Sequence, residues 1–316
     1  MVPPNDPILS EKQLAHYEEF GFIHSIPILT AAEIAYYRAE AEKTCREIGP
    51  NVTRLDNVHF FFRWAWDLST HRRLLNSLQQ ILGPNIVLKS TRIFYKHPQS
   101  DSYVGWHQDG ITERLNDGRA PAVWLGLTRA TVANGCLRVV PKSHRLGLLE
   151  HIARPIQDNL DEQSHRYKRL RSRSRETEMS GKVTMLPADA PVAFDLVMRP
   201  GEMSIHHPGI LHGSNANRST EPRIGLSASY SSPELFDGAK AVWACGEGRG
   251  DACNFECIDR PPDLPFEKAV TAYRNSDFQI LFAQTREAGP LRQKSAKPTN
   301  DNSPPIYRWD SETSIE

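Results

Sequence analysis

The chain has 316 residues, 39% of them hydrophobic, and its 38 basic and 38 acidic side chains give a formal net charge of zero. This length suits one large domain, and the charge balance gives no reason to expect a nucleic-acid or membrane partner, so we expect a small-molecule substrate. No window approaches the roughly 18 apolar residues of a membrane span, and residues 1–7 lack the features of a signal peptide, so we predict a cytoplasmic protein. We also expect it to be a monomer or a homodimer.

Two helices near the N-terminus are predicted by the residues that begin them. Ser10 and Thr30 each stand three residues before a Gln or Glu, ahead of an apolar-periodic run. This is the capping-box spacing, in which the first turn of a helix and the residue before it exchange hydrogen bonds. We therefore predict helices over about 10–20 and 30–48.

Two further segments complete the N-terminal part of the chain, about 10–82. Residues 21–26 lead to a proline and are predicted to be extended. Residues of about 70–82 have a helical pattern that stops at Gly83-Pro84. Glycine tolerates left-handed geometry and proline cannot continue the hydrogen-bond ladder, so we predict that the helix ends there.

From Ile86 the sequence changes to short runs rich in Val, Ile, Phe and Tyr, separated by Gly, Pro and Asn. Such runs are typical of antiparallel strands. They cover residues 86–95, 122–129, 136–140, 191–197, 202–206 and 223–230. Helices followed by many short strands, without strand and helix alternating, predict a mainly β fold with flanking α: a double-stranded β-helix (jelly roll, cupin-like) buttressed by N-terminal helices.

We expect a single domain over residues 1–286, with its jelly-roll core at about 86–235. The stretch 165–176 is rich in Arg and Lys and interrupts the β pattern, which predicts an exposed basic insertion. A solvated loop is the common explanation of such a run; a nucleic-acid patch, or a loop that closes on an anionic substrate, are alternatives. Residues 287–316 have few apolar side chains and are predicted to be a disordered tail.

A metal site is indicated by the short segment around His107 and Asp109. In an extended chain, side chains two positions apart leave the same face, so this pair can bind one ion. His212 follows another β run and can supply a third ligand from a distant strand. Two histidines and one carboxylate on one face of a metal form the facial triad of non-haem iron(II) oxygenases. A His-x-Asp triplet alone is a weak signal, because it occurs often by chance.

Arg223 strengthens this interpretation. It begins the predicted strand that follows His212, where a guanidinium group can pair with the far carboxylate of a dicarboxylic acid. A permanent cation beside an iron site requires an anion. The combination of the three ligands with Arg223 therefore favours an oxygenase that uses a dicarboxylate.

The chain resembles the phytanoyl-CoA dioxygenase (PhyH) family of iron(II), 2-oxoglutarate enzymes from about residue 10 to about 235. Three segments in this order carry the resemblance: 106–109 (WHQD), 134–144 (NGCLRVVPKSH) and 212–223 (HGSNANRSTEPR). One position departs from the family pattern, since Lys142 stands where a glycine is usual. That turn holds no expected ligand.

The resemblance implies the cofactors and their residues. Iron(II) would be bound by His107, Asp109 and His212. The cosubstrate 2-oxoglutarate would be bound at its far carboxylate by Arg223, and its other expected neighbours are Ser214, Trp124 and Arg92. With dioxygen, such an enzyme hydroxylates an unactivated C–H bond of a small metabolite, of secondary-metabolite tailoring or acyl-CoA type, and releases succinate and carbon dioxide.

Several alternatives stay open. Desaturation or epoxidation can start from the same iron centre, whereas halogenation is disfavoured because related halogenases have Ala or Gly where this chain has Asp109. A jelly-roll protein of the same ancestry can bind a ligand without turnover. A zinc hydrolase can use the same ligands, but this leaves Arg223 without a role.

Other candidate side chains are better explained by packing. The chain has five cysteines, and the spacing of Cys245, Cys253 and Cys257 does not match a paired zinc motif, so we expect reduced thiols. Cys136 and His144 are expected in a structural strand and turn. His206 and His207 are expected to be core or supporting histidines rather than a fourth ligand. Trp106 either lines the pocket or packs in the core.

Overall fold

The computed structural model describes residues 8–110, 120–149, 151–152, 182–183, 192–236, 240–246, 256–257, 263–276 and 281–282. All of these lie in one compact unit, Met1–Gln284. The basic insertion expected at 165–176 and the tail expected at 287–316 lie outside the described residues. The expected end of the domain at residue 286 stays a prediction for the same reason.

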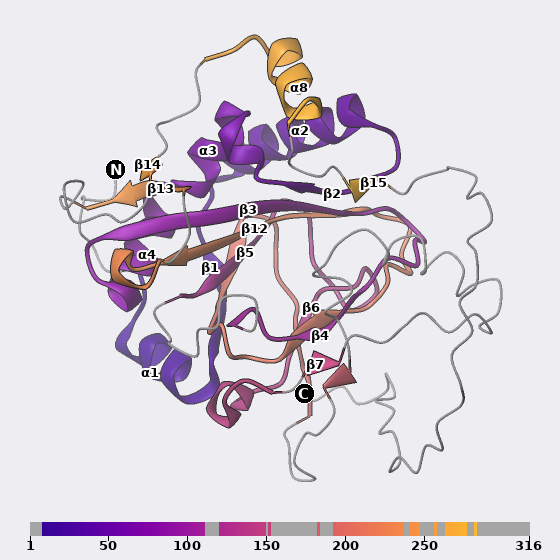
Figure 1. Ribbon diagram of the computed structural model, residues 1–316. Helices are drawn as coiled ribbons and strands as arrows, with labels where there is room; N and C mark the ends of the chain where they lie inside the picture. Colours follow the sequence, from indigo (N-terminus) through magenta and orange to yellow (C-terminus); the bar gives the residue numbers. More distant parts are fainter. Residues whose placement is uncertain are drawn as a thin grey trace, which may run out of the picture. The chain divides into compact units, whose positions relative to one another are not determined.

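Most strands belong to one large sheet, in the order β1-β10-β5-β12-β3-β13-β14, with β2 beside β3 and β15 beside β2 (Figure 1). These strands are β1 (Phe22–Pro27), β2 (Val52–Asp56), β3 (Ile86–Lys96), β5 (Ala122–Gly126), β10 (Glu202–His206), β12 (Arg223–Ser231), β13 (Lys240–Cys245), β14 (Glu256–Cys257) and β15 (Leu281–Phe282). Neighbours are antiparallel, except that β13 and β14 are parallel. The large sheet therefore contains strands from both ends of the described chain.

A small sheet of four strands, in the order β4-β11-β6-β9, completes the jelly roll. Its strands are β4 (Val104–His107), β6 (Leu137–Val139), β9 (Phe194–Leu196) and β11 (His212–Ser214), and a separate pair is formed by β7 (His151–Ile152) and β8 (Lys182–Val183). The predicted fold class is confirmed. Each of the six predicted strand segments overlaps an observed strand: β3, β5, β6, β9, β10 and β12.

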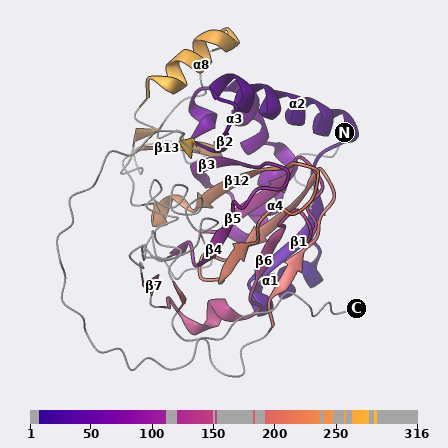
Figure 2. The same cartoon turned by 90° about the vertical axis from the view of Figure 1, so that its right-hand side faces the viewer.

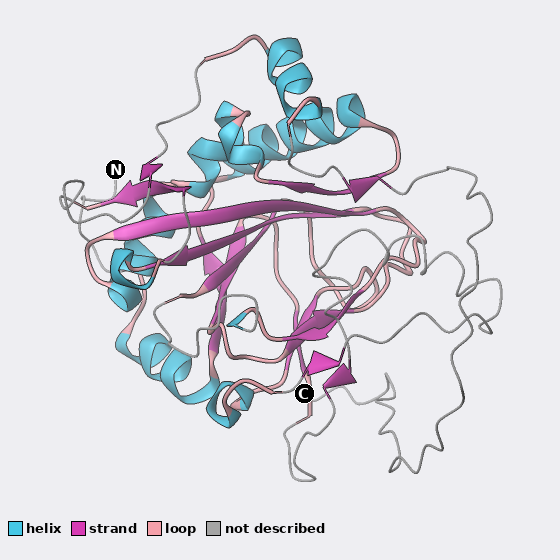
Figure 3. Ribbon diagram, in the orientation of Figure 1, coloured by secondary structure: helices cyan, strands magenta, loops and turns pink. Residues whose placement is uncertain are grey.

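Helices α2 (Ala31–Ile48), α3 (Arg63–Ser69) and α8 (Phe266–Arg274) cover the face of the large sheet that points away from the small sheet (Figure 2, Figure 3). Both predicted capping boxes are present, at Ser10 before α1 (Glu11–Phe20) and at Thr30 before α2. Helix α4 (Arg72–Leu82) ends at Gly83, as predicted, with a φ of 85°. Among the described residues, no helix is both long and apolar enough to span a membrane.

Two hydrophobic cores result from the alternation of side chains along the strands. Ile93 and Leu125 face the helices and belong to the larger core. Trp124, the neighbour of Leu125, faces the other way and packs with Val139 and Ile210 of the small-sheet side. The space between the sheets is therefore lined by the opposite face of β3, β5 and β12, and this is where the candidate site lies.

Candidate metal centre and cosubstrate site

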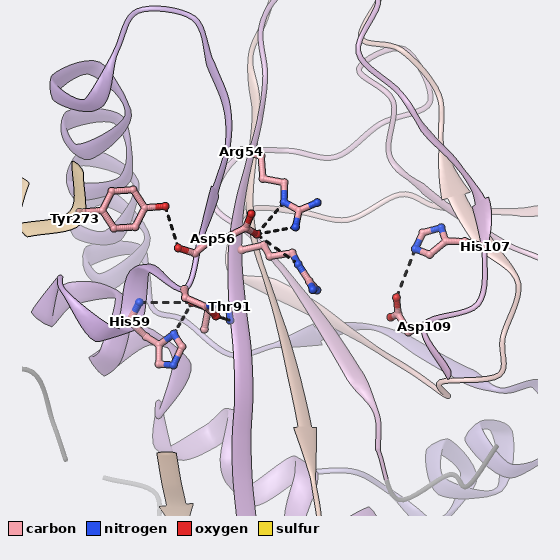
Figure 4. A network of polar contacts seen from close by, with 9 residues as sticks. Arg54, Asp56, His59, Thr91, His107, Asp109 and Tyr273 are labelled. Carbon is pink, nitrogen blue, oxygen red and sulfur yellow. Dashed lines mark hydrogen bonds and ion pairs between the residues drawn. The ribbon is translucent and has the colours of Figure 1, made fainter. Parts of the chain in front are cut away.

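His107, Asp109 and His212 are brought together by the pairing of β4 with β11. His107 ends β4, His212 begins β11, and the two are direct cross-strand partners. Asp109 follows β4 by two residues. One ligand atom from each side chain lies within 4.8 Å of the others. His107 Nε2 is 3.4 Å from Asp109 Oδ1 (Figure 4). His212 Nε2 is 3.7 Å from Asp109 Oδ2.

Backbone carbonyl groups orient both imidazole rings. Nδ1 of His107 donates to the carbonyl oxygen of Gly105 at 2.8 Å, and Nδ1 of His212 donates to that of Ile210 at 3.0 Å. A carbonyl oxygen only accepts, so the ring proton lies on Nδ1 in each case. The Nε2 lone pairs are left to face Asp109, which is the arrangement that metal-binding histidines require.

The carboxyl group of Asp109 is ionised at neutral pH. Burial raises its pKa, but the electrostatic effect of His212, the hydrogen bond with His107 and the charge of Arg92 act the other way and hold the pKa below its ordinary value. One carboxylate and two imidazole nitrogens within this distance are a suitable donor set for a divalent transition metal. The residues present therefore fit the expected metal.

A buried cation lies further into the space between the sheets. Arg223, at the start of β12, is 2% exposed, and its guanidinium group stacks over Trp124 at 4.9 Å from the ring centre. Nη1 of Arg223 donates to the carbonyl oxygen of Gly135 at 2.8 Å. Within the described part of the chain, neither Nε of Arg223 nor Nε1 of Trp124 has a hydrogen-bond partner. Buried donors of this kind are rare, and they fit an anionic ligand.

Lys96 adds a second buried cation at this place, and the sequence analysis missed it. It ends β3 as the direct cross-strand partner of Arg223 and is 3% exposed. Its Nζ donates to Ser214 Oγ at 2.8 Å, to the carbonyl oxygen of Gly135 at 3.3 Å and to that of Asn215. Burial, with the charge of Arg223, lowers the pKa of Lys96 well below its ordinary value. Among the described residues, no carboxylate pairs with Lys96 or Arg223.

Comparison with known proteins agrees with this geometry. The sequence profile of the phytanoyl-CoA dioxygenase family matches residues 17–225. The chain belongs to this family. It is accordingly an iron(II)- and 2-oxoglutarate-dependent dioxygenase, whose cofactors are iron(II), 2-oxoglutarate and dioxygen.

Individual relatives differ in what they act on. The chain is 26% identical to an ectoine dioxygenase of Nocardia farcinica, over 71% of this chain and 78% of the relative. It is 24% identical to the peroxisomal phytanoyl-CoA dioxygenase of Homo sapiens, over 72% and 70%. Among solved structures, the apo form of the non-heme monooxygenase ThoJ matches with a TM-score of 0.62 and 25% identity, over 82% of this chain and 92% of that one.

The other residues that the sequence singled out lie in different surroundings. Ser214 lies two residues after His212 and accepts a hydrogen bond from Lys96. Arg92 lies four residues before Lys96, at the metal end, where its Nε is 3.5 Å from Asp56 Oδ1. Cys136 is buried in the core between the sheets, as expected.

The histidines near His212 lie close to other imidazole rings. His206 is 2% exposed and its ring lies parallel to that of His212, 5.9 Å away. Its Nε2 has no hydrogen-bond partner among the described residues. His144 and His207 lie against each other at 4.8 Å. Cys245 and Cys257 are free thiols, and Cys253 lies outside the described residues.

Proposed function

We propose that the protein hydroxylates an unactivated C–H bond of a small metabolite, with His107, Asp109 and His212 as the iron ligands. The observation that carries the proposal is the combination of this donor set with a buried pair of cations in the same space between the sheets. When bound, iron(II), 2-oxoglutarate and dioxygen supply the oxidising chemistry, with release of succinate and carbon dioxide.

The chain's own residues bind and orient. Arg223 and Lys96 are proposed to bind the far carboxylate of 2-oxoglutarate, because two buried guanidinium and ammonium groups are stabilised by an anion and offer it charge-assisted hydrogen bonds. Ser214 is held at the same place by Lys96. Trp124 offers its buried indole N–H.

Arg92 is proposed to lie at the other end of the cosubstrate, because its charge reaches Asp109. The packed aromatic and aliphatic side chains around Trp124 keep water from this region. Asp109, held as an anion, is proposed as a ligand through all steps. We also propose that the protein acts in the cytoplasm as a monomer or homodimer, without a nucleic-acid or membrane partner.

Anaerobic titration tests the proposal directly. Iron(II) and 2-oxoglutarate, added together to the purified protein, are expected to produce the weak visible charge-transfer band of the bidentate chelate. The variant His212→Ala is expected to lose this band, because one of the two imidazole ligands is removed. Arg38→Gln, at an exposed ion pair on α2, is the control and should keep it. A folded wild-type protein without the band would contradict the proposed function.

A further inference from the structure

Gln108 stands between two of the proposed metal ligands, His107 and Asp109, and its side chain leaves the opposite face of the chain. Side chains alternate along an extended segment, so Gln108 points away from the metal when its two neighbours point toward it. The residue is nevertheless buried, with only 2% exposed. A buried amide group requires hydrogen-bond partners to offset the loss of water. The partners of Gln108 lie on two other segments of the chain, one of which leads to the third ligand.

The amide group of Gln108 connects these segments. Its Nε2 donates to the carbonyl oxygen of Gly209 at 2.6 Å and to that of Gly147 at 2.9 Å. Its Oε1 accepts from the backbone N–H of Leu149 at 2.8 Å. An amide group has two N–H donors, and both are used here. Gln108 thus joins its own segment to the chain near Gly147 and to the loop that connects β10 with β11.

The loop between β10 and β11 leads to His212, the third proposed ligand. Gly209 precedes Ile210, whose carbonyl oxygen accepts from Nδ1 of His212 and so sets the orientation of its ring. The backbone N–H of Gly110 donates to the carbonyl oxygen of Pro208 at 2.8 Å. The loop is therefore bound at two consecutive residues, and both bonds come from the two residues that flank the carboxylate ligand.

Asp109 depends on these bonds because it lies beyond the end of a strand. The pairing of β4 with β11 ends at His107, two residues earlier. Gly110 follows Asp109, and glycine has the greatest backbone freedom of all residues. The hydrogen bonds made by residues 108 and 110 fix the backbone on both sides of Asp109. They thereby direct its carboxylate group toward the two imidazole rings.

We propose that Gln108 is a positioning residue for the metal: it does not bind the ion, but holds Asp109 and the ring of His212 in the arrangement that binding requires. The inference rests on the proposed function, because it concerns the same metal site. Groups that orient metal ligands typically contribute a factor of about 10 to 100 to metal affinity. A neutral amide group is suited to this role, because it supplies hydrogen bonds without adding a charge beside Asp109.

The variant Gln108→Met tests the inference, because methionine is similar in size but cannot donate a hydrogen bond from its side chain. Metal-free protein is titrated with manganese(II), and the free ion is measured by its electron paramagnetic resonance signal. The Kd for manganese(II) is expected to rise at least about tenfold relative to the wild-type protein. The melting temperature of the metal-free protein is measured in parallel.

Gln80 provides a matched control, because its amide group also joins segments that are far apart in the chain. Its Nε2 donates to the carbonyl oxygen of Leu9 at 2.8 Å, and its Oε1 accepts from the backbone N–H groups of Ile8 and Leu9 at 2.9 and 2.8 Å. Gln80→Met should lower the melting temperature, since similar bonds are lost, but leave the Kd for manganese(II) within about twofold of wild type. A purely structural role of Gln108 would make the two variants alike in metal affinity.

Amide hydrogen exchange gives a second measurement, on the wild-type protein, which does not depend on the folding of a variant. If Gln108 favours metal binding, bound metal must in turn stabilise the hydrogen bonds of Gln108, because coupling between two equilibria is reciprocal. The N–H of Leu149, bound to Gln108 Oε1, is therefore expected to exchange more slowly when manganese(II) is added. The N–H of Leu9, bound to Gln80 Oε1, should slow by a smaller factor.

Two results would overturn the inference. One is a folded Gln108→Met variant that binds manganese(II) as tightly as Gln80→Met does. The other is an N–H of Leu149 whose exchange slows no more than that of Leu9, and this result decides alone if Gln108→Met does not fold. Failure of the wild-type protein to bind manganese(II) is a different result, since it contradicts the proposed metal site itself.

Discussion

Lys96 is expected to have opposite effects on the stability of the fold and on ligand binding. Its ammonium group is buried beside the guanidinium group of Arg223, and like charges in a desolvated place raise the free energy of the folded protein. An anion bound between them reverses this effect. A residue that is unfavourable for folding alone would thus favour the proposed binding of a dicarboxylate.

Lys96→Met is expected to separate the two effects. The KM for 2-oxoglutarate should rise at least about tenfold, because one charge-assisted contact is lost. The melting temperature of the protein without cosubstrate should stay the same or rise, because a buried like charge is removed. Steady-state kinetics and a thermal melt measure the two quantities. Lys142→Met, at an exposed lysine paired with Glu19, is the control, and an unchanged KM in Lys96→Met would contradict the assignment.

The 3-10 helix η1 (Val58–Phe60) connects the helical layer to the large sheet through a buried histidine. His59 Nδ1 lies 2.7 Å from Thr91 Oγ1 of β3, and the ring is fully buried. Burial lowers the pKa of His59 to about 3. Between about pH 3 and pH 6.5, the ordinary pKa of histidine, the unfolded chain therefore binds a proton at this residue that the folded protein does not bind.

His59 is accordingly expected to make the protein sensitive to acid. Its contribution to stability is present above pH 6.5 and is lost as the pH falls, by up to about 1.4 kcal/mol per pH unit. The slope of the unfolding free energy against pH reports how many more protons the unfolded chain binds. In His59→Gln this number should fall by about one between pH 6 and pH 4. A smaller slope should remain, because the pKa of His206 is also lowered to about 3. Denaturant titrations at several pH values measure the slope. An unchanged slope would contradict a neutral, buried His59.

Other elements show which local sequence signals were sufficient to predict where a helix begins or ends. The capping boxes at Ser10 and Thr30 and the stop at Gly83 were all predicted, because each depends on residues within one turn of the helix end. Helix α3 and strand β2 were not predicted. They are short, and what holds them is contact with distant segments: β2 pairs with β3 and β15.

At the scale of the whole molecule, the two sheets supply different parts of the site. The small sheet and the second residue after β4 carry the three proposed metal ligands, whereas β3 and β12 of the large sheet carry Lys96 and Arg223. A metal with 2-oxoglutarate bound to it would thus connect the sheets. Binding of the metal together with 2-oxoglutarate should therefore stabilise the described unit as a whole.

Thermal melts test this connection. With manganese(II), which does not support turnover, 2-oxoglutarate at about 100 times its Kd should stabilise the folded protein by about 2.7 kcal/mol. For a protein of this size the rise in Tm is about 4–5 °C. Without metal the rise should be much smaller, because only the far carboxylate is held. Equal rises with and without metal would contradict a site shared between the sheets.

The sequence by itself determined the local features and the family. Capping boxes, strand runs and the His107–Asp109 spacing are short-range patterns, and the order of these with His212 and Arg223 was specific enough to indicate the family. The fold class followed from the same patterns.

Only the tertiary structure decided which distant side chains meet. Strand register places Lys96 opposite Arg223 and Asp56 opposite Arg92, and a shift by one residue would turn each of these side chains to the other face. Register between segments far apart in the chain depends on packing across both sheets, which no local pattern records. For this reason the second cation, Lys96, became visible only in the fold.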